Sequence, residues 1–316
     1  MGADEKVMKQ FPFKQIAKWT LILIIFAFLG KMVRDHWDEI RNASFTLRLI
    51  PFGLGTFLFI VAYFIQVGAW YLVTLKVGIA LNFRETAAAW FYSQLGKYLP
   101  GKVWILIGRF YLYESKGRGK QAISLALYFE TITMLMAAGL ISLIALAPVG
   151  VRWIDPRGGW FPILLFSLGF FFLILHPRVL EKMINPILSI LGRNPLRLSV
   201  SYWDMLWILF VNLLAWCLGG LGFYFFIDSI FPVTRDYVLF LSGALALSSI
   251  LGLVAVFAPG GLGVREGVLV YLLSHIIPGG VAVVLSVLTR VWMTLIEVGL
   301  VGMIYLCDHF GTRQDR

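Results

Sequence analysis

Apolar residues along this chain form long runs that are separated by short charged connections. Because the hydrocarbon core of a bilayer is about 30 Å thick, an apolar run of about 20 residues can cross it as a helix. The pattern predicts an all-α polytopic membrane protein with about six full transmembrane helices. The predicted spans are residues 19–33, 50–76, 121–147, 160–175, 204–227 and 281–307.

Two further apolar regions, residues 86–113 and 237–277, are each interrupted by proline and glycine. The residues at these breaks are Pro100 and Gly101 in the first region and Pro259, Gly260, Gly261 and Gly263 in the second. Proline lacks a backbone donor and glycine permits positive φ, so neither break should continue as regular helix. A piece of about ten to thirteen helical residues reaches roughly 15–20 Å and is too short to cross. We therefore predict two re-entrant helical hairpins. The alternative is that residues 237–257 cross the membrane and the breaks are kinks.

The order of spans and hairpins predicts an inverted repeat within a single membrane domain, residues 1–316. Residues 1–147 contain two spans, a hairpin from the cytoplasmic side and a span. Residues 160–307 contain the same order with the hairpin entering from the external side. Inverted repeats bring two discontinuous helices to the bilayer midplane, where transporters bind their substrates.

The composition indicates a membrane environment, because 59% of the residues are hydrophobic and only 14% are charged. A soluble domain with this balance would expose large apolar patches. The net charge of +10 could suggest nucleic acid in a soluble protein, but basic loops facing anionic lipid explain it here. No nucleic-acid partner is expected.

The distribution of positive charge predicts that both termini lie in the cytoplasm. We expect the membrane to be the plasma membrane. Residues 148–159 are then an external loop. The connection at residues 34–48 disagrees with the rule, because it would place three arginines outside.

Ionisable side chains inside the predicted spans are candidates for function, because each costs about a few kcal/mol at mid-membrane. Glu130 and Arg290 fall at matching depths in corresponding spans. They form either an internal ion pair or a site for substrate or protons. Glu297 follows on the same helix face as Arg290 and either shares that pair or stands apart from it.

More charged residues gather at the two breaks. Lys97, Lys102 and Arg109 surround the first break, and Arg265 and Glu266 follow the second. Arginine forks and helix N-terminal N–H groups bind anions, so these residues suit a phosphate headgroup. For the two lysines the alternative is snorkelling to the membrane interface. For Arg265 it is an internal bond to carbonyls of the break.

No motif for nucleotides, metals or catalysis is found. The glycines of the second break lack the Gly-Lys-Ser/Thr of a P-loop and the preceding strand of a dinucleotide site. The four histidines lack metal-ligand spacing, and no Ser-His-Asp or Cys-His arrangement can be argued. We expect a protein that is not an enzyme and uses no cofactor or metal.

Two stretches carry a resemblance to a known family. They are QLGKYLPGKVW at residues 94–104, followed by Gly108 and Arg109, and APGGLGVRE at residues 258–266. The chain resembles the lysylphosphatidylglycerol synthase transmembrane-region family, also described as flippase-like membrane proteins of bacteria and archaea. The resemblance implies translocation of a lipid between leaflets. Members are associated with aminoacylated phosphatidylglycerol, glycolipids, isoprenoid-linked sugars or hopanoids.

The synthases of this family carry a soluble aminoacyl-transferase domain after the membrane region, and this sequence stops at Arg316. Synthase activity is therefore not expected. The expected function is flippase-like translocation of an anionic phospholipid or lipid-linked headgroup, with an anionic or polyprenyl-linked membrane lipid as the partner. A second copy of the chain or a membrane transferase is a candidate protein partner. Two alternatives stay open, namely a lipid-binding accessory subunit of a transferase and a small-solute secondary transporter.

Overall fold

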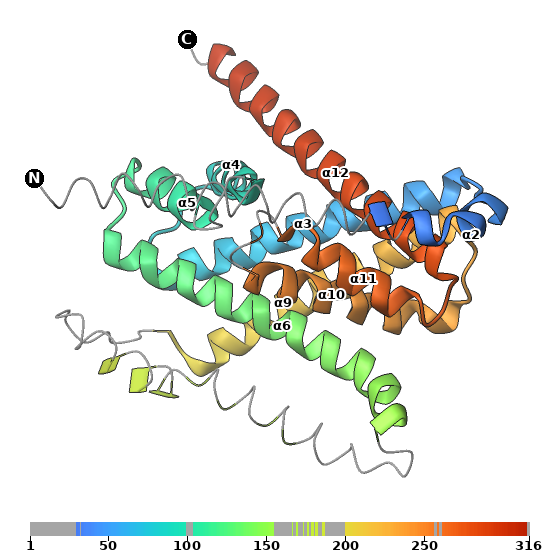
Figure 1. Ribbon diagram of the computed structural model, residues 1–316. Coiled ribbons are helices and arrows are strands. Elements are labelled where there is room, and N and C mark those ends of the chain that lie inside the picture. The colour runs from blue at the N-terminus through green and yellow to red at the C-terminus, as the bar shows by residue number, and fades with distance from the viewer. Residues whose placement is uncertain are drawn as a thin grey trace, which may run out of the picture.

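A computed structural model describes most of the chain, and every regular element in the described residues is helical (Figure 1). The described residues are 30–31, 33–98, 104–154, 200–255, 258, 261–314 and ten single positions between 166 and 186. The side chains of residues 147–154 and 308–314 are not among them. The all-α prediction is confirmed.

The longest helices are α3 (Leu49–Val77), α6 (Lys120–Ile154), α9 (Tyr202–Ile230) and α12 (Gly279–Gln314). Shorter elements are α2 (Trp37–Asn42), α4 (Phe83–Gln94), η1 (Leu95–Tyr98), α5 (Trp104–Glu114), η2 (Arg235–Tyr237), α10 (Val238–Val254) and α11 (Val264–Leu273). Figure 1 shows α12 extending beyond the rest of the bundle at its C-terminal end.

Helices α3 and α9 pack side by side. An ion pair joins them at each end, with Lys76 Nζ 2.7 Å from Asp204 Oδ1 and Arg48 Nη2 2.6 Å from Asp228 Oδ2. Because the end of α3 meets the start of α9, and its start meets the end of α9, the two helices are antiparallel. The aspartates lie at helix ends, where a charge can reach water at little cost.

Five helices within the described residues are long and apolar enough to cross a membrane. Four of them agree with predicted spans, namely Leu49–Val77, Lys120–Leu146, Tyr202–Ile230 and Gly279–Cys307. The fifth, Arg235–Val254, occupies the first half of the second predicted hairpin. Predicted spans 19–33 and 160–175 lie almost entirely outside the described residues.

The predicted external loop at residues 148–159 is wrong at its start. Helix α6 continues through Ile154, so Pro148 lies inside the helix. The charged connection at residues 34–48 also contains structure that the pattern did not predict. There, Glu39 of α2 accepts a 2.7 Å hydrogen bond from Gly280 N at the start of α12.

The break in region 86–113 separates two short helices that pack against each other as an antiparallel pair. A Cβ on Gly96 would lie 2.7 Å from Ile105 N, and a Cβ on Gly108 would lie 3.7 Å from Ser93 Cα. Position 96 therefore lies beside position 105, and position 93 beside position 108, so the two segments run in opposite directions. Only a glycine at position 96 allows η1 to approach the start of α5 this closely. Pro100, Gly101 and Lys102 lie outside the described residues.

The break in region 237–277 also separates two helices that pack together, α10 and α11. Gly261 and Gly263 have φ values of +71° and +80°, as the glycine pattern predicted. Pro259 and Gly260 lie outside the described residues. The two breaks are confirmed. The re-entrant character of the hairpins and the inverted repeat stay predictions, and Arg235–Val254 is long and apolar enough to cross a membrane by itself, as the alternative has it.

Candidate functional site

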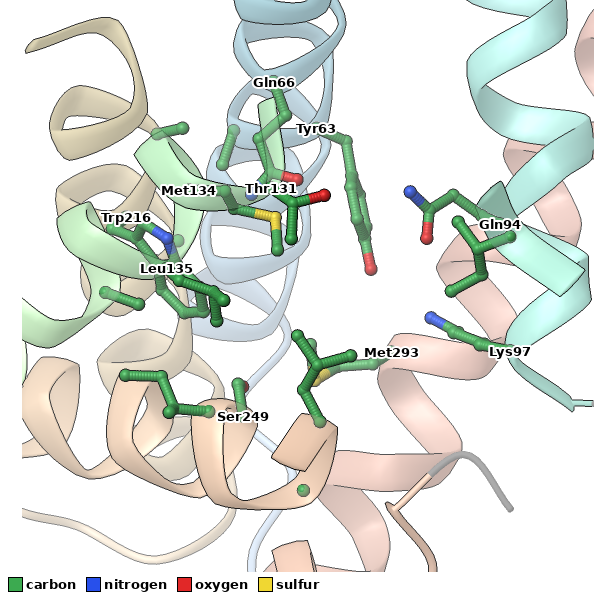
Figure 2. Close-up of a pocket in the computed structure, with 18 of the residues that line it drawn as sticks. Tyr63, Gln66, Gln94, Lys97, Thr131, Met134, Leu135, Trp216, Ser249 and Met293 are labelled. Atoms are coloured by element: carbon green, nitrogen blue, oxygen red, sulfur yellow. The ribbon is translucent and has the colours of Figure 1, made fainter. Parts of the chain in front are cut away.

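The bundle contains a partly open cavity of about 280 Å³ that is lined by residues from both breaks and from the long helices. Its polar and charged lining residues include Tyr63, Gln66, Gln94, Lys97, Arg109, Glu130, Arg265 and Glu297. Its apolar lining residues include Met134, Leu135, Ala138, Leu245 and Ile250, and the large ring of Trp216 lies among them. Figure 2 shows Gln94 and Lys97 on one side of the space, facing Tyr63, with Gln66, Met134 and Thr131 on the other. A cavity lined by both charged and apolar side chains suits an amphipathic ligand.

The first charged cluster in the cavity wall is an ion pair between Arg109 of α5 and Glu130 of α6. Trp90 Nε1 donates to Glu130 Oε1 at 3.0 Å, and Arg109 Nε donates to Ser93 Oγ at 3.1 Å. The guanidinium also lies 4.7 Å from the centre of the Trp70 ring. Arg109 is 1% exposed, so its charge is held by a carboxylate, a hydroxyl and an aromatic face.

The second cluster is centred on Glu297 of α12. Its Oε1 accepts hydrogen bonds from Lys97 Nζ and from Tyr63 OH. Tyr98 OH donates to Oε2 at 2.7 Å. Because Lys97 and Tyr98 both belong to η1, this carboxylate fastens the first break to α12. Its charge is satisfied by one cation and two hydroxyl donors.

The third ion pair joins Glu266 of α11 to Arg290 of α12, with Oε1 and Nη1 2.9 Å apart. Glu266 Oε2 also accepts a 2.6 Å hydrogen bond from Gly263 N. This bond satisfies one of the free N–H groups at the start of α11. Glu266 is 4% exposed, and neither residue of this pair is among the described cavity lining.

Arg265 differs from the other cavity cations because no carboxylate pairs with it among the described residues. It lines the cavity, and its Nη2 lies 2.8 Å from the thioether sulfur of Met293. A thioether is a weak acceptor, so most of the hydrogen-bonding capacity of this guanidinium is unused. The internal alternative, a bond to carbonyls of the break, stays a prediction, because residues 256, 257, 259 and 260 of the break lie outside the described residues.

The structure corrects the hypothesis of a Glu130–Arg290 ion pair. Glu130 pairs with Arg109 and Arg290 pairs with Glu266. Matching depth along two helices places the two residues at the same level of the membrane, but it does not show which way their side chains point. Here the two side chains point to different neighbours. Each observed pair joins the short helix after a break to the next long helix. In the first pair the short helix carries the arginine, and in the second pair it carries the glutamate.

Five of the eight charged candidates line the cavity, namely Lys97, Arg109, Glu130, Arg265 and Glu297. Glu266 and Arg290 stabilise the second break instead. Lys97 points into the cavity (Figure 2), so snorkelling to the interface is the wrong alternative for this residue. Lys102 lies outside the described residues.

The sequence pattern did not identify the uncharged polar residues of the cavity as candidates. Gln66 and Gln94 both line it, and neither side chain makes a hydrogen bond to a described residue. The signal that could have found them is an amide inside an otherwise apolar run. A search restricted to ionisable groups does not detect that signal. In the part of the chain that the structure describes, no cluster of His, Cys, Asp or Glu could hold a metal ion.

The fold and the cavity define a multi-pass helical membrane protein with charged residues buried between its helices. The chain belongs to the family of the lysylphosphatidylglycerol synthase transmembrane region, whose family model matches residues 15–302. The match includes both breaks and every charged residue of the cavity. No curated protein matches the chain.

Proposed function

We propose that this protein translocates an anionic lipid, or a lipid-linked headgroup, between the leaflets of the plasma membrane. The observation that carries the proposal is Arg265, a part-buried cation that lines the cavity and has no carboxylate partner among the described residues. A partly desolvated arginine favours an anion, and a planar guanidinium binds phosphate through two parallel hydrogen bonds. We assign transport rather than catalysis.

A lipid fits the cavity better than a fully polar solute because the lining is partly charged and partly apolar. Charged and amide side chains reach the cavity from the short helices of both breaks and from α3, α6 and α12, and apolar side chains such as Leu135 of α6 and Leu245 of α10 line the same space. A phosphate headgroup would lie against the charged residues. The beginning of an acyl or isoprenoid chain would lie against the apolar ones.

The two broken regions support a transport mechanism. We propose that they are re-entrant hairpins of an inverted repeat, entering from opposite faces while both termini remain cytoplasmic. In such transporters, the rocking of one repeat against the other exposes a central site to each face in turn. Here each break is attached to a long helix through a charged side chain. These contacts would break and re-form as one repeat moves against the other.

Reconstitution tests the proposal directly. Purified protein is placed in liposomes with a trace of fluorescent phosphatidylglycerol, and a membrane-impermeant quencher measures how much of it reaches the outer leaflet. Wild-type protein should accelerate the exchange. Arg265→Lys should fold normally but be slow, because lysine keeps the charge and loses the planar fork. Arg235→Lys, at an exposed arginine in η2, is the matched control and should behave as wild type.

Two results would replace the proposal with its alternatives. Lipid that is retained through purification without any exchange between leaflets would indicate an accessory lipid-binding subunit. A protein that retains no lipid and exchanges none, yet takes up soluble anions, would indicate a small-solute transporter.

A further inference from the structure

One carboxylate in the cavity wall, that of Glu297, connects α12 with both α3 and η1. Its Oε1 accepts hydrogen bonds from Tyr63 of α3 and from Lys97 of η1. Tyr98 of η1 donates to Oε2 at 2.7 Å, and its hydroxyl also lies 3.2 Å from Thr294 Oγ1. Two of the three donors therefore belong to η1 and leave together if η1 moves away from α12, whereas Tyr63 stays.

Arg265 of α11 reaches α12 one helical turn before this carboxylate. Its Nη2 lies 2.8 Å from the sulfur of Met293, and side chains four residues apart share a helix face with Cβ atoms about 5–6 Å apart. Met293 and Glu297 both line the cavity. Figure 2 shows Tyr63, Lys97 and Met293 pointing toward the same part of the space. An arginine side chain can cover one helical turn by changing its rotamer, which brings the guanidinium to Glu297.

The two cations give up different contacts when they change partners. Arg265 leaves a thioether, which is a weak acceptor, and gains a charge-assisted hydrogen bond to a carboxylate. Lys97 leaves a buried carboxylate, so its release requires a second cation to take its place. Lys97 also belongs to a 3₁₀ element, Leu95–Tyr98, and short 3₁₀ stretches often mark hinges. The element that holds Lys97 is thus suited to move once Arg265 has replaced it.

We propose that Glu297 exchanges its ion-pair partner between the two breaks. In the state that the structure shows, Glu297 holds Lys97 and leaves Arg265 facing the cavity. In the second state Arg265 binds Glu297, and Lys97 is released together with η1. Tyr63 positions the carboxylate in both states. The identity of the anion that uses the available cation rests on the proposed function, whereas the exchange itself does not.

The exchange gives the two breaks alternating roles in binding. An anion held by Arg265 is released when Glu297 takes that arginine, and it then meets the Lys97 ammonium that Glu297 has given up. The anion is thereby transferred from the second break to the first without leaving either cation unpaired. Binding at each break is coupled to the position of η1, because both ligand and Glu297 compete for the same two cations.

A double-mutant cycle in thermal unfolding of the purified full-length protein tests the shared partner. Lys97→Gln should lower the melting temperature by less than about 3 °C, because Arg265 replaces the lysine, and Arg265→Gln should do the same. The double variant leaves Glu297 without a cation and should lose about 6 °C or more, which exceeds the sum of the two losses.

Two controls separate a shared partner from other causes of coupling. Repeating the cycle on a Glu297→Gln background should give losses that add. Coupling that persists there would come from direct repulsion between the two cations and would overturn the proposal. Lys76→Gln removes a cation that pairs with Asp204 instead, so its loss should add to that of Arg265→Gln.

The affinity for fluorescent phosphatidylglycerol in detergent tests the alternation of the binding cation. Lys97→Gln lets Glu297 capture Arg265, so the affinity should fall about tenfold or more, which is the scale of a charge-assisted hydrogen bond. Adding Glu297→Gln sets Arg265 free again and should restore the affinity. A purely structural role of Lys97 gives no such rescue, because the second substitution would only add damage.

Three results would overturn the exchange. Additive losses in the cycle would show that Lys97 and Arg265 do not share a partner. A loss from Lys97→Gln alone that equals the loss of the double variant would show that Arg265 is held elsewhere, for example by carbonyls of the break. An affinity that Glu297→Gln does not restore would contradict the capture of Arg265. The proposed function fails separately, if the cycle is coupled as described but the reconstituted protein moves no lipid between leaflets.

Discussion

The two breaks in this chain contain similar residues but use their charges in opposite ways. At the first break both described cations are neutralised by carboxylates on the long helices, Lys97 by Glu297 and Arg109 by Glu130. At the second break the carboxylate is the neutralised residue, because Glu266 binds Arg290 and caps α11. Its neighbour Arg265 is left facing the cavity with a sulfur as its hydrogen-bond acceptor.

A charged residue near a helix break is therefore not by itself a binding residue. Arg109 and Glu266 are almost fully buried, at 1% and 4% exposure, and their hydrogen bonds hold the backbone of each break in place. Arg265 becomes a candidate for binding because no carboxylate among the described residues forms an ion pair with it. The predictions below test this division between stabilising and binding charges.

The largest effect is expected at the Arg109–Glu130 pair. Glu130→Gln leaves a buried guanidinium without its carboxylate, which should lower the stability in detergent by about 3–5 kcal/mol. Adding Arg109→Gln should restore part of the loss, because the double variant contains no unpaired charge. Thermal unfolding of the single and double variants measures the coupling. Losses that simply add would contradict it. The exposed Glu114–Lys120 pair is the control, and Glu114→Gln should cost less than about 1 kcal/mol.

Two arginines near the second break should respond differently to the same substitution. Arg290→Gln leaves Glu266 buried and unpaired, with an expected loss of up to about 3–5 kcal/mol. Arg265→Gln removes a charge that has no carboxylate partner among the described residues, so it should change stability by less than about 1 kcal/mol and lower lipid retention instead. Melting temperature and lipid retained per folded protein are measured on both variants. If Arg265→Gln proves as destabilising as Arg290→Gln, Arg265 is a structural clamp.

A smaller effect is expected from the backbone of the second break. Gly261→Ala places a methyl group 2.8 Å from Gly252 O in a residue with φ of +71°. Gly78→Ala is a matched control, because its φ is +78° but no atom lies within 4 Å of the new methyl group. The control should cost about 1–2 kcal/mol for the left-handed backbone alone. Gly261→Ala should lower the stability by more than the control does. Equal losses of stability in thermal unfolding would show that the backbone of Gly252 accommodates the methyl group without strain.

The sequence predicted those parts of the structure that depend on local signals. Four spans and both breaks could be found because apolar length and Pro/Gly content act on the chain where they occur. The positive φ of Gly261 belongs to the same class of signal. The continuation of α6 past Pro148 could not be predicted in this way, because a proline does not always end a membrane helix.

The pairing of charges could not be predicted, because it depends on how the helices are rotated and placed side by side. Glu130 and Arg290 have matching depths, yet Glu130 binds Arg109, which is only 21 residues away and lies on the neighbouring short helix. Gln66 and Gln94 were missed because an uncharged amide inside a span gives a weaker signal than a charge.

The smallest effect is expected at the open end of the first hairpin, where Lys116 Nζ lies 2.5 Å from Glu85 Oε1. This pair joins the start of α4 to the residues after α5 and adds a surface contact to the buried charges of the first break. The hydrogen bond from Lys116 is the main cause that lowers the pKa of Glu85 below its ordinary value. Because the pKa is lower in the folded state, the stabilisation is present above the unfolded pKa and is lost as the pH falls through the folded value. Glu85→Gln should therefore cost about 0.2–1 kcal/mol at neutral pH and nothing once Glu85 is protonated. Melting temperatures of wild type and variant across this range measure the difference. A constant difference at all pH values would show that the carboxylate charge is not the source of the stabilisation.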